Sequence, residues 1–442
     1  MDIVVKIAQL ILALSILVFI HELGHFLFAR LFKIRVDKFY LFFDWGWRIF
    51  KFKPKNSDTE YGIGWLPLGG YCKIAGMVDE SMDTESLKKE PQPWEFRSKP
   101  AWQRFLVIFG GVFFNILLAI AVYSAVLFTW GEEYVKNSDV TTGVAVNRLA
   151  YDMGFRDGDR ILAFNGEYVE DFADLQISLI RNQAKYATVV RGGDTITVNI
   201  DPVFLPAVLQ SRELIFNFGI PAVVSAVPEN SINSGSGLQK GDRIVSLNGS
   251  PIATFSGLVM RLAECKGDSV KVTVERGGEE LSLPLALNAE KKIMVEFNAS
   301  LQDYYKITQK EYSLPGALAA GFNTTFKTVA NYWKELKLIV SPKTEAYKSV
   351  GSFITIGSIF PGSWNWEIFW NLTAFLSVML AVINILPIPA LDGGHLLFTV
   401  YEMVTGRKPS DKFLIAAQTV GMFLLFAIMI LAFGNDIVRL FN

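Results

Sequence analysis

Three residues near the start of the chain have types and a spacing suited to metal-dependent hydrolysis. His21, Glu22 and His25 form the pattern His-Glu-x-x-His within "FIHELGHFLFARLF". On a helix, residues four apart lie on one face, so both imidazoles can ligate a single Zn²⁺. The glutamate would then lie beside the metal, where it can take a proton from water and pass it to a leaving amine. The pattern predicts a zinc hydrolase site in this helix.

A catalytic zinc site needs a third protein ligand and one open position. The chain has three histidines, and the one outside this motif is His395, which lies close to Asp392 in "NILPIPALDGGHLLF" (384–398). Residue type alone leaves both side chains as candidates. Pro387 and Pro389 predict a helix break here, which is tolerated at membrane depth where the backbone is buried in protein or lines a cavity. An ordinary helix end with a polar turn would produce the same pattern.

Both motifs belong to apolar stretches long enough to cross a membrane. Hydrophobic residues make up 51% of the 442-residue chain, and the net charge of −1 gives no indication of nucleic-acid binding. Ionisable groups inside a membrane span are costly and mark function, which favours the catalytic interpretation of the first motif. Four stretches could span about 30 Å of hydrocarbon: 7–32, 102–130, 366–386 and 413–433.

The distribution of basic residues predicts the orientation. Residues 31–100 hold twelve Lys or Arg side chains, whereas the terminal segments outside the spans hold few. Cytoplasmic loops carry such an excess, so residues 31–100 should face the cytoplasm, with both termini and residues 131–365 outside. The two motifs then lie at the same depth, towards the cytoplasmic ends of their spans. Cys72 and Cys265 lie on opposite sides of the membrane, where they cannot pair.

The outer segment contains two copies of one module. "GFRDGDRILAFNG" (154–166) and "GLQKGDRIVSLNG" (237–249) share seven of thirteen residues, and each is followed by a stretch around Arg-Gly-Gly. The turn residues and short apolar runs predict two small β-rich domains. A helix with apolar residues at steps of three and four should follow, lying on the outer membrane surface or, alternatively, packed against the β-rich copies. Its apolar residues are Leu318, Phe322, Phe326, Val329, Trp333, Leu336 and Val340.

The repeated pattern Gly-Leu-x-x-Gly-Asp-x-Ile-x-x-x-Asn-Gly resembles PDZ domains of the bacterial protease-associated kind. Together with "HELGH" and "NILPIPALDGG", the tandem copies closely resemble the site-2 intramembrane zinc metalloproteases, of the regulator of sigma-E protease type. This resemblance runs over nearly the whole chain. It implies a Zn²⁺ ion held by His21, His25 and Asp392. It also implies Glu22 as general base and Asn384 as a residue that helps to hold substrate near the metal.

The resemblance further implies a membrane-associated β-hairpin between the first two spans. The matching stretch is "TEYGIGWLPLGGYCKI" (59–74), with two short strands around residues 66–70. An exposed strand edge there could pair with a substrate segment unwound from its helix, and we expect Ile63 and Gly64 to offer the backbone groups. Alternatively, the hairpin is only a structural plug.

The expected fold is a polytopic α-helical membrane protein with four transmembrane helices, a membrane-associated β-hairpin and two extracytoplasmic PDZ-like β-rich domains. The predicted parts are the first span (1–33), a cytoplasmic region with the hairpin (34–101), the second span (102–130), the first and second PDZ-like domains (131–207 and 208–298), the amphipathic helix and a connecting region (299–365), the third span with "NILPIPALDGG" (366–398), and a short loop with the fourth span (399–442).

The expected function is zinc-dependent cleavage within the membrane-spanning segments of single-pass proteins. The setting is the bilayer of a bacterial inner membrane, and the enzyme is expected to act as a monomer. Its substrates would be a pre-cut anti-sigma factor and remnant signal peptides, with the PDZ pair excluding proteins that have bulky outer domains. A catalytically silent PDZ scaffold is the main alternative, but a scaffold has no need of Glu22. A metal transporter is a second alternative, and spans two and four lack the chain of polar residues that it would need.

Overall fold

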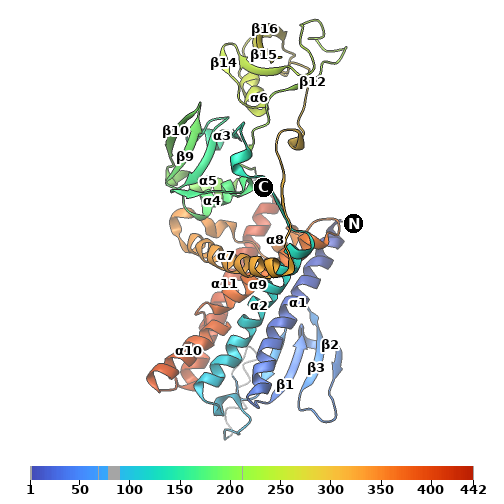
Figure 1. Cartoon of the computed structure of the whole chain (residues 1–442). Coiled ribbons are helices and arrows are strands. Elements are labelled where there is room, and N and C mark those ends of the chain that lie inside the picture. The colour runs from blue at the N-terminus through green and yellow to red at the C-terminus, as the bar shows by residue number, and fades with distance from the viewer. Residues whose placement is uncertain (1, 68, 78–89, 212, 442) are drawn as a thin grey trace. The chain divides into compact units, whose positions relative to one another are not determined.

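The computed structural model describes residues 2–67, 69–77, 90–211 and 213–441, which divide into two compact units (Figure 1). The first unit holds the long helices and one four-stranded sheet, and the second is rich in short strands. The first unit comprises Met1–Gly131, Glu311–Lys337 and Tyr347–Asn442, and the second comprises Glu132–Lys310 and Leu338–Ala346.

Among the described residues, four helices are long and apolar enough to cross a membrane. They are α1 (Asp2–Leu31), α2 (Ala101–Thr129), α9 (Trp366–Ile385) and α11 (Asp411–Phe441). Helix α2 is central, because it contacts α1, α9 and the short helix α10 (Asp392–Thr405). The four predicted spans are therefore found, and their apolar composition fits a polytopic membrane protein.

The third predicted span, 366–386, is confirmed, because α9 ends at Ile385. The part of the chain assigned to this span as far as residue 398 also contains a separate helix, since α10 begins at Asp392. Pro387 and Pro389 lie between them, and proline lacks the amide hydrogen and has a ring that clashes with the preceding turn. The span is thus followed by a loop and a second, separate helix.

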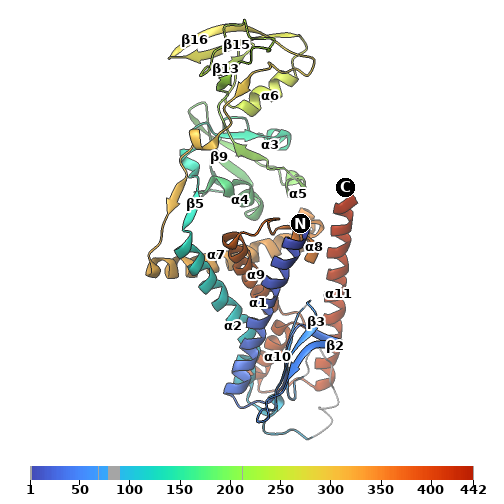
Figure 2. The same ribbon diagram turned by 90° about the vertical axis from the view of Figure 1, so that its right-hand side faces the viewer.

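The segment between α1 and α2 forms a mixed sheet, not the predicted hairpin. Its strands are β1 (Val36–Leu41), β2 (Phe43–Phe52), β3 (Glu60–Leu66) and β4 (Tyr71–Ile74), in the order β2-β3-β1-β4. Strand β1 lies between β3 and β4, parallel to the first and antiparallel to the second. The sheet lies beside α1, which β1 and β4 contact (Figure 2).

Strand β1 separates β3 from β4 because it carries the side chains that fill the sheet core. Val36 and Tyr40 are completely buried. The Tyr40 ring covers Gly62 of β3, where a Cβ atom would lie 2.3 Å from the ring, and its hydroxyl donates to Glu60 Oε1 over 2.6 Å. A two-stranded hairpin would lack these buried contacts and would be marginal by itself.

The second unit contains the predicted duplication. The two main sheets have the matching orders β8-β7-β9-β10 and β14-β13-β15-β16. One helix accompanies each sheet at the equivalent place in the repeat. It is α4 (Leu175–Arg181) in the first copy and α6 (Phe255–Ala263) in the second. The strands of the first copy are β7 (Arg160–Phe164), β8 (Glu167–Tyr168), β9 (Tyr186–Arg191) and β10 (Asp194–Asn199). Those of the second are β13 (Arg243–Leu247), β14 (Ser250–Pro251), β15 (Ser269–Arg276) and β16 (Glu279–Ala286).

The residues that are repeated in the two sequence motifs make the same contacts in both copies. The Arg-Gly-Gly arginine of each copy bonds the aspartate of its Gly-Asp turn, at 2.7 Å for Arg191 Nε to Asp159 and 2.6 Å for Arg276 Nε to Asp242. Both aspartates are completely buried. Because a buried carboxylate needs a charged or hydrogen-bonding partner, each copy retains its own arginine.

The boundary between the copies lies later than predicted. Strand β11 (Phe216–Phe218) pairs with β6 (Val144–Val146) of the first copy. Val208 and Ile215 are buried in the core of the first copy. The division expected between residues 207 and 208 is therefore wrong, because strand pairing and burial assign the chain as far as Phe218 to the first copy. The second copy is closed in the same way by β12 (Val224–Ala226) and β17 (Glu296–Phe297).

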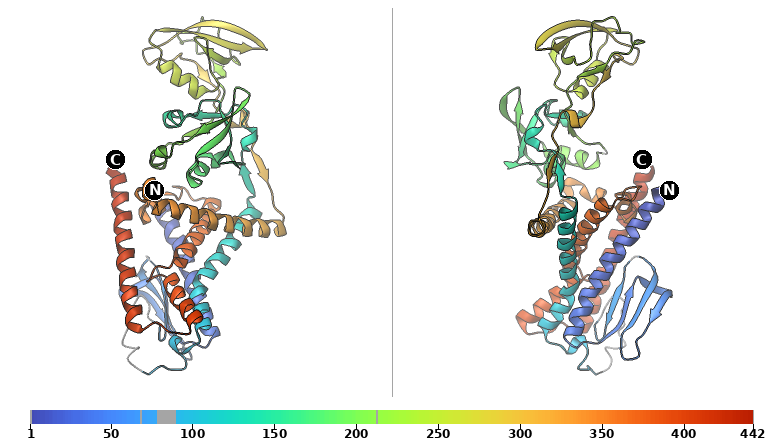
Figure 3. Two further views of the ribbon diagram at one scale, coloured as in Figure 1. Left: turned by 90° about the vertical axis from the view of Figure 1, so that its left-hand side faces the viewer. Right: turned by 45° about the vertical axis from the view of Figure 1, so that its right-hand side comes forward.

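The predicted amphipathic helix is α7 (Leu314–Val340). In the first unit, Val329, Tyr332 and Leu336 pack against residues of α2 and α9. Figure 3 shows α7 running across the long helices of the first unit. Other apolar side chains of the predicted stripe stay exposed: Leu318, Phe322, Phe326, Trp333 and Val340. An exposed apolar stripe is the feature that a helix on a membrane surface requires.

Candidate active site

The first two site residues lie on one face of α1. His21 and His25 are buried, and their Nε2 atoms are 3.3 Å apart. Between them, Gly24 allows the α1 backbone to meet α2, since a Cβ atom at Gly24 would lie 2.2 Å from the carbonyl oxygen of Gly110. Small residues permit such close helix approach in membranes.

Gly111 makes room on α2 for both imidazoles. A Cβ atom at this position would lie 2.5 Å from His21 Cε1 and 2.5 Å from His25 Nε2. Any larger residue would displace the two rings. The local sequence "FGGVFFN" of α2 therefore determines where the two histidines can lie.

Asp392 completes the cluster from the opposite end of the chain. It is the first residue of α10, directly after the proline-containing loop. Its Oδ2 atom lies 3.3 Å from His21 Nε2 and 3.4 Å from His25 Nε2. The break between α9 and α10 thus gives the carboxylate its position against α1.

The three atoms form a nearly equilateral triangle that matches a zinc ion. The centre of such a triangle lies its side divided by √3 from each corner, here about 1.9 Å, next to the roughly 2.0–2.2 Å of Zn–N and Zn–O bonds. Asp392 Oδ2 is buried and has no conventional hydrogen bond within the described part of the chain. A buried acceptor in this state favours a cation. Two imidazoles and one carboxylate are also a known ligand set for catalytic zinc.

The second nitrogen of each histidine has a partner on α2. His25 Nδ1 lies 2.9 Å from the carbonyl oxygen of Val107, and His21 Nδ1 lies 3.1 Å from the side-chain amide of Asn115. Metal binding through Nε2 leaves Nδ1 as a donor, so the oxygen of the Asn115 amide should face His21. That orientation also satisfies the buried Asn115 oxygen, which otherwise has no described partner. Ser377 of α9 holds Asn115 in turn, by donating to its backbone oxygen over 2.8 Å.

Glu22 lies beside the cluster and next to the sheet. It is half-buried, and its carboxylate accepts a hydrogen bond from the backbone of Cys72 in β4. Cys72 lies opposite Phe39 of β1. Among the described residues β4 is an outer strand of its sheet, and it is the strand whose backbone bonds the glutamate.

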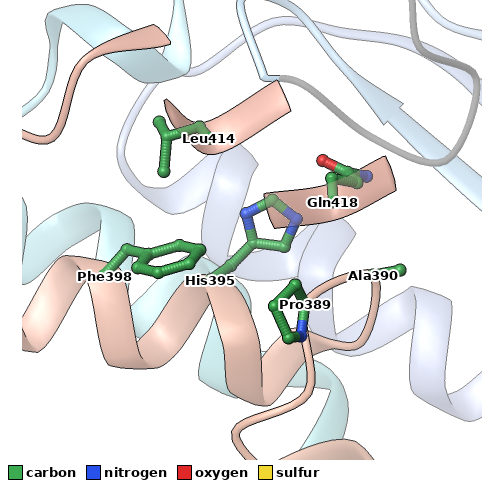
Figure 4. Close-up of a pocket in the computed structure, with 6 residues that line it drawn as sticks. All are labelled: Pro389, Ala390, His395, Phe398, Leu414 and Gln418. Carbon is green, nitrogen blue, oxygen red and sulfur yellow. The ribbon is translucent and has the colours of Figure 1, made fainter. Parts of the chain in front are cut away.

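The structure brings together some of the predicted site residues and not others. Asn384 lies half-buried in the last turn of α9, before the loop that leads to Asp392. His395 lies on α10 (Figure 4), and the described metal-binding group consists of the other three ligands without it. Ile63 and Gly64 lie in β3, which pairs with both β1 and β2, so the prediction that they offer a free strand edge is wrong.

Sequence reasoning missed two contacts, those of Asn115 and Cys72. Asn115 is a polar residue inside an apolar span, which is itself a signal of function. Cys72 acts through its backbone, so no side-chain pattern could indicate it.

Comparisons with known proteins show which family this chain resembles. A family model described as "Peptidase family M50" matches residues 9–428. "Regulator of sigma-E protease RseP" of Escherichia coli K12 is 29% identical over 477 residues, covering 98% of each chain. The protein of the same name from Salmonella typhimurium 14028s is 29% identical, over 98% of this chain and 99% of its own. "Putative zinc metalloprotease RSc1411" of Ralstonia nicotianae is 27% identical over 98% of each chain.

Proposed function

Because this chain belongs to peptidase family M50, we propose that it is a zinc-dependent endopeptidase of the bacterial inner membrane that cleaves transmembrane segments of single-pass proteins. The convergence of His21, His25 and Asp392 on one point beside Glu22 carries this proposal. The four apolar helices support its membrane location. The names of the relatives support both the metal and the reaction class.

The proposed roles follow from the positions of the side chains. His21, His25 and Asp392 hold the ion, which when bound supplies a Lewis acid that polarises the substrate carbonyl and activates water. Glu22 takes the proton from the attacking water and delivers it to the leaving amine. Asn115 and the carbonyl of Val107 fix the orientation of the two imidazoles. Asn384, at the end of α9, is proposed to bond the substrate backbone.

The sheet is proposed to receive the substrate at β4. A peptide bond in an intact helix is shielded, because its carbonyl accepts a hydrogen bond from the residue four positions later. An unwound segment can replace those bonds by pairing with a free strand edge. The outer strand β4 bonds Glu22 through its backbone, so a substrate strand aligned beside it would bring its peptide bonds to the general base. Ile63 and Gly64 would then support the sheet from its interior.

The outer parts are proposed to select the substrate. Two β-rich copies that resemble PDZ domains would exclude proteins with bulky outer domains, and the exposed stripe of α7 would lie on the outer membrane surface. A pre-cut anti-sigma factor and remnant signal peptides are the proposed substrates. Two relatives are named as regulators of sigma-E, which supports the first of these.

Substitution of the general base tests the function. Glu22→Gln should abolish cleavage of a membrane-embedded reporter, while zinc content stays at about one ion per chain because no ligand is changed. Retention of full cleavage would refute the proposed enzyme. If neither the wild-type chain nor the variant cleaves any reporter but both move metal across vesicles, the chain is a transporter. Partner recruitment without cleavage or transport would instead indicate the scaffold.

A further inference from the structure

In the first β-rich copy, strand β11 occupies one edge of β6. The two strands are antiparallel, and Phe218 of β11 lies opposite Val144 of β6. The other edge of β6 is used as well, because the amide of Val144 donates to the carbonyl oxygen of Asp159 over 2.8 Å. The residue before β11, Ile215, donates its amide to the side-chain oxygen of Gln176 in α4 over 2.8 Å. This added strand is therefore held both by β6 and by the helix of its copy.

The second copy has an added strand in the equivalent place, and this strand is β17. It is antiparallel to β12, and Phe297 of β17 lies opposite Val224 of β12. The amide of Asn298 continues the pairing by donating to the carbonyl oxygen of Val223 over 2.9 Å. The other edge of β12 is used as in the first copy, because the amide of Val224 donates to the carbonyl oxygen of Asp242 over 2.9 Å.

One aromatic ring of each added strand packs on a phenylalanine at the start of the helix. Phe218 stacks on Phe172, which begins the turn that leads into α4, with 4.1 Å between the ring centroids. Phe297 packs on Phe255, the first residue of α6, with 4.8 Å between the centroids. Phe172 and Phe255 are equivalent residues, because they are separated by the same number of positions as the two motifs that start at 154 and 237. The same contact among an edge-strand valine, an added aromatic ring and a helix-start phenylalanine therefore occurs twice.

Strand addition is also the way in which PDZ domains bind an extended peptide from another chain. Main-chain hydrogen bonds to the edge strand provide affinity, and side chains that enter pockets provide specificity. Here the chain itself supplies both parts, the paired backbone and the aromatic ring. We propose that β11 and β17 are internal ligands of the two copies, each occupying the position at which a separate peptide would bind. Both copies are then closed to a free peptide while these strands are in place, which separates them from PDZ domains that capture peptides.

The internal ligand of the second copy is held less firmly than that of the first. Ile215 and Phe216 are buried in the core of the first copy, so β11 cannot leave without exposing that core. In β17, by contrast, Glu296 is exposed and Phe297 is half-buried, and the strand has only these two residues. Removal of β17 therefore leaves most of the core of the second copy in place, and this copy is the one to test.

The first test removes the internal ligand and offers the same segment as a free peptide. Phe297→Ala combined with Asn298→Pro removes the aromatic ring and the amide that bonds Val223. The probe is a fluorescent peptide with the sequence "IMVEFNAS" of residues 293–300, and its fluorescence anisotropy is measured with the full-length protein in detergent. A tethered strand acts at an effective concentration of about 1 mM, so a micromolar peptide cannot compete with it. The double variant should therefore bind the peptide at least about tenfold more tightly than the wild-type protein does.

Two controls accompany this measurement. Leu301→Ala, at an exposed apolar residue that follows β17, should bind the peptide no better than the wild-type protein. A peptide in which alanine replaces the phenylalanine should bind the double variant weakly, because it lacks the ring that packs on Phe255. Equal binding by the wild-type protein and the double variant would overturn the proposal that β17 closes the position. A double variant that keeps the slow hydrogen exchange of β13 and β15 but binds no peptide would overturn the proposal that the position accepts one.

The second test detects β17 in its place in solution, and neither test depends on zinc or on cleavage. Residues opposite each other in antiparallel strands have Cα atoms about 4.5–5.5 Å apart, which is within the range that a disulfide spans. In a chain whose two natural cysteines are replaced by alanine, Val224→Cys with Phe297→Cys should form a disulfide when the purified protein is treated with a mild oxidant. Val224→Cys with Leu301→Cys is the matched control and should stay reduced. Equal disulfide formation in the two pairs, or none in the first, would show that β17 does not occupy the edge of β12.

Discussion

The Nε2 atom of His25 lies 3.4 Å from Oδ2 of Asp392, although nearly the whole chain separates the two residues. The other ring nitrogen of His25 lies 2.9 Å from the carbonyl oxygen of Val107. One imidazole therefore links α1 to α10 on one side and to α2 on the other. The arrangement requires a buried acceptor on each side, and it leaves the point between the three ligand atoms available to an ion.

Removal of the carboxylate ligand should release the metal. Asp392→Ala is expected to weaken zinc binding by about 100-fold or more, beyond the 10–100-fold typical of outer partners. Zinc affinity of the purified protein measures this effect. Asp37→Ala, at a carboxylate of β1 that pairs with Arg35, is the control and should bind zinc normally. Unchanged zinc affinity in Asp392→Ala would remove Asp392 from the ligand set.

Asn115 should affect metal binding without contacting the ion. Asn115→Leu removes the partner of His21 Nδ1 and leaves the size of the side chain almost unchanged. We expect zinc affinity to fall by about 10–100-fold. Asn435→Leu is the control, because Asn435 bonds backbone oxygens of Tyr347 and Val350 away from the site. Unchanged zinc affinity in Asn115→Leu, or an equal loss in Asn435→Leu, would contradict the role given to Asn115.

The edge of β4 can be tested through its backbone. Cys72→Pro removes the amide that bonds Glu22, whereas Cys72→Ala keeps it. Cleavage should fall about tenfold or more in the proline variant, since an unsatisfied buried group costs about 1–3 kcal/mol. The alanine variant should retain most of the cleavage. Equal cleavage by both variants would show that neither the edge nor the bond to Glu22 matters.

The two cysteines report the orientation. A thiol reagent that cannot cross membranes should label Cys265 from outside intact cells and should not label Cys72. Both cysteines are half-buried in the structure. Labelling after cell disruption provides the control for reactivity. Labelling of Cys72 from outside would reverse the proposed topology.

The second β-rich copy should lose stability in acid. Burial alone would raise the pKa of Asp242, but the charge and hydrogen bonds of Arg276, together with the backbone hydrogen bond from Gln239, lower the pKa below its usual value. A carboxylate with a lowered pKa stabilises the fold above its unfolded pKa, and this stability is lost as the pH falls through the folded pKa. Arg276→Ala should therefore destabilise the copy by about 1–3 kcal/mol near neutral pH, and less as the pH falls below about 4.

Hydrogen exchange of the full-length protein measures this effect copy by copy. Exchange should accelerate in β13 and β15 of Arg276→Ala, while the first copy serves as an internal control. Arg191→Ala should accelerate exchange in the first copy and leave the second unchanged, because Arg191 is paired with Asp159 in the first copy. Uniform acceleration in both copies would mean that they unfold together.

The features predicted correctly from the sequence depend on local spacing. His21 and His25 are one helical turn apart in any helix, so their pairing needs no tertiary information. The repeated turns around Asp159 and Asp242 form similar local contacts in each copy. Pro387 and Pro389 predicted a break in the helix, but they did not predict the separate helix that follows it.

The features that were missed depend on contacts distant in sequence. Strand β3 pairs with both β1 and β2, so Ile63 and Gly64 lie inside the sheet. The glycine-rich sequence by itself had predicted that they lie at the edge of a hairpin. At Gly64 a Cβ atom would lie 2.2 Å from the backbone oxygen of Phe43, so the glycine there serves strand packing. The assignment of Phe216 to the first copy likewise depends on its pairing with Val146.

The placement of the ligands on α1 and α10 also affects biosynthesis. A ribosome delivers His21 and His25 to the membrane first and Asp392 only when most of the chain has been made. Any nascent or truncated chain that ends before Asp392 has an incomplete ligand set. With the proposed ligand set, such a chain cannot complete the zinc site, so cleavage of neighbouring proteins is expected to begin only after most of the protease has been made.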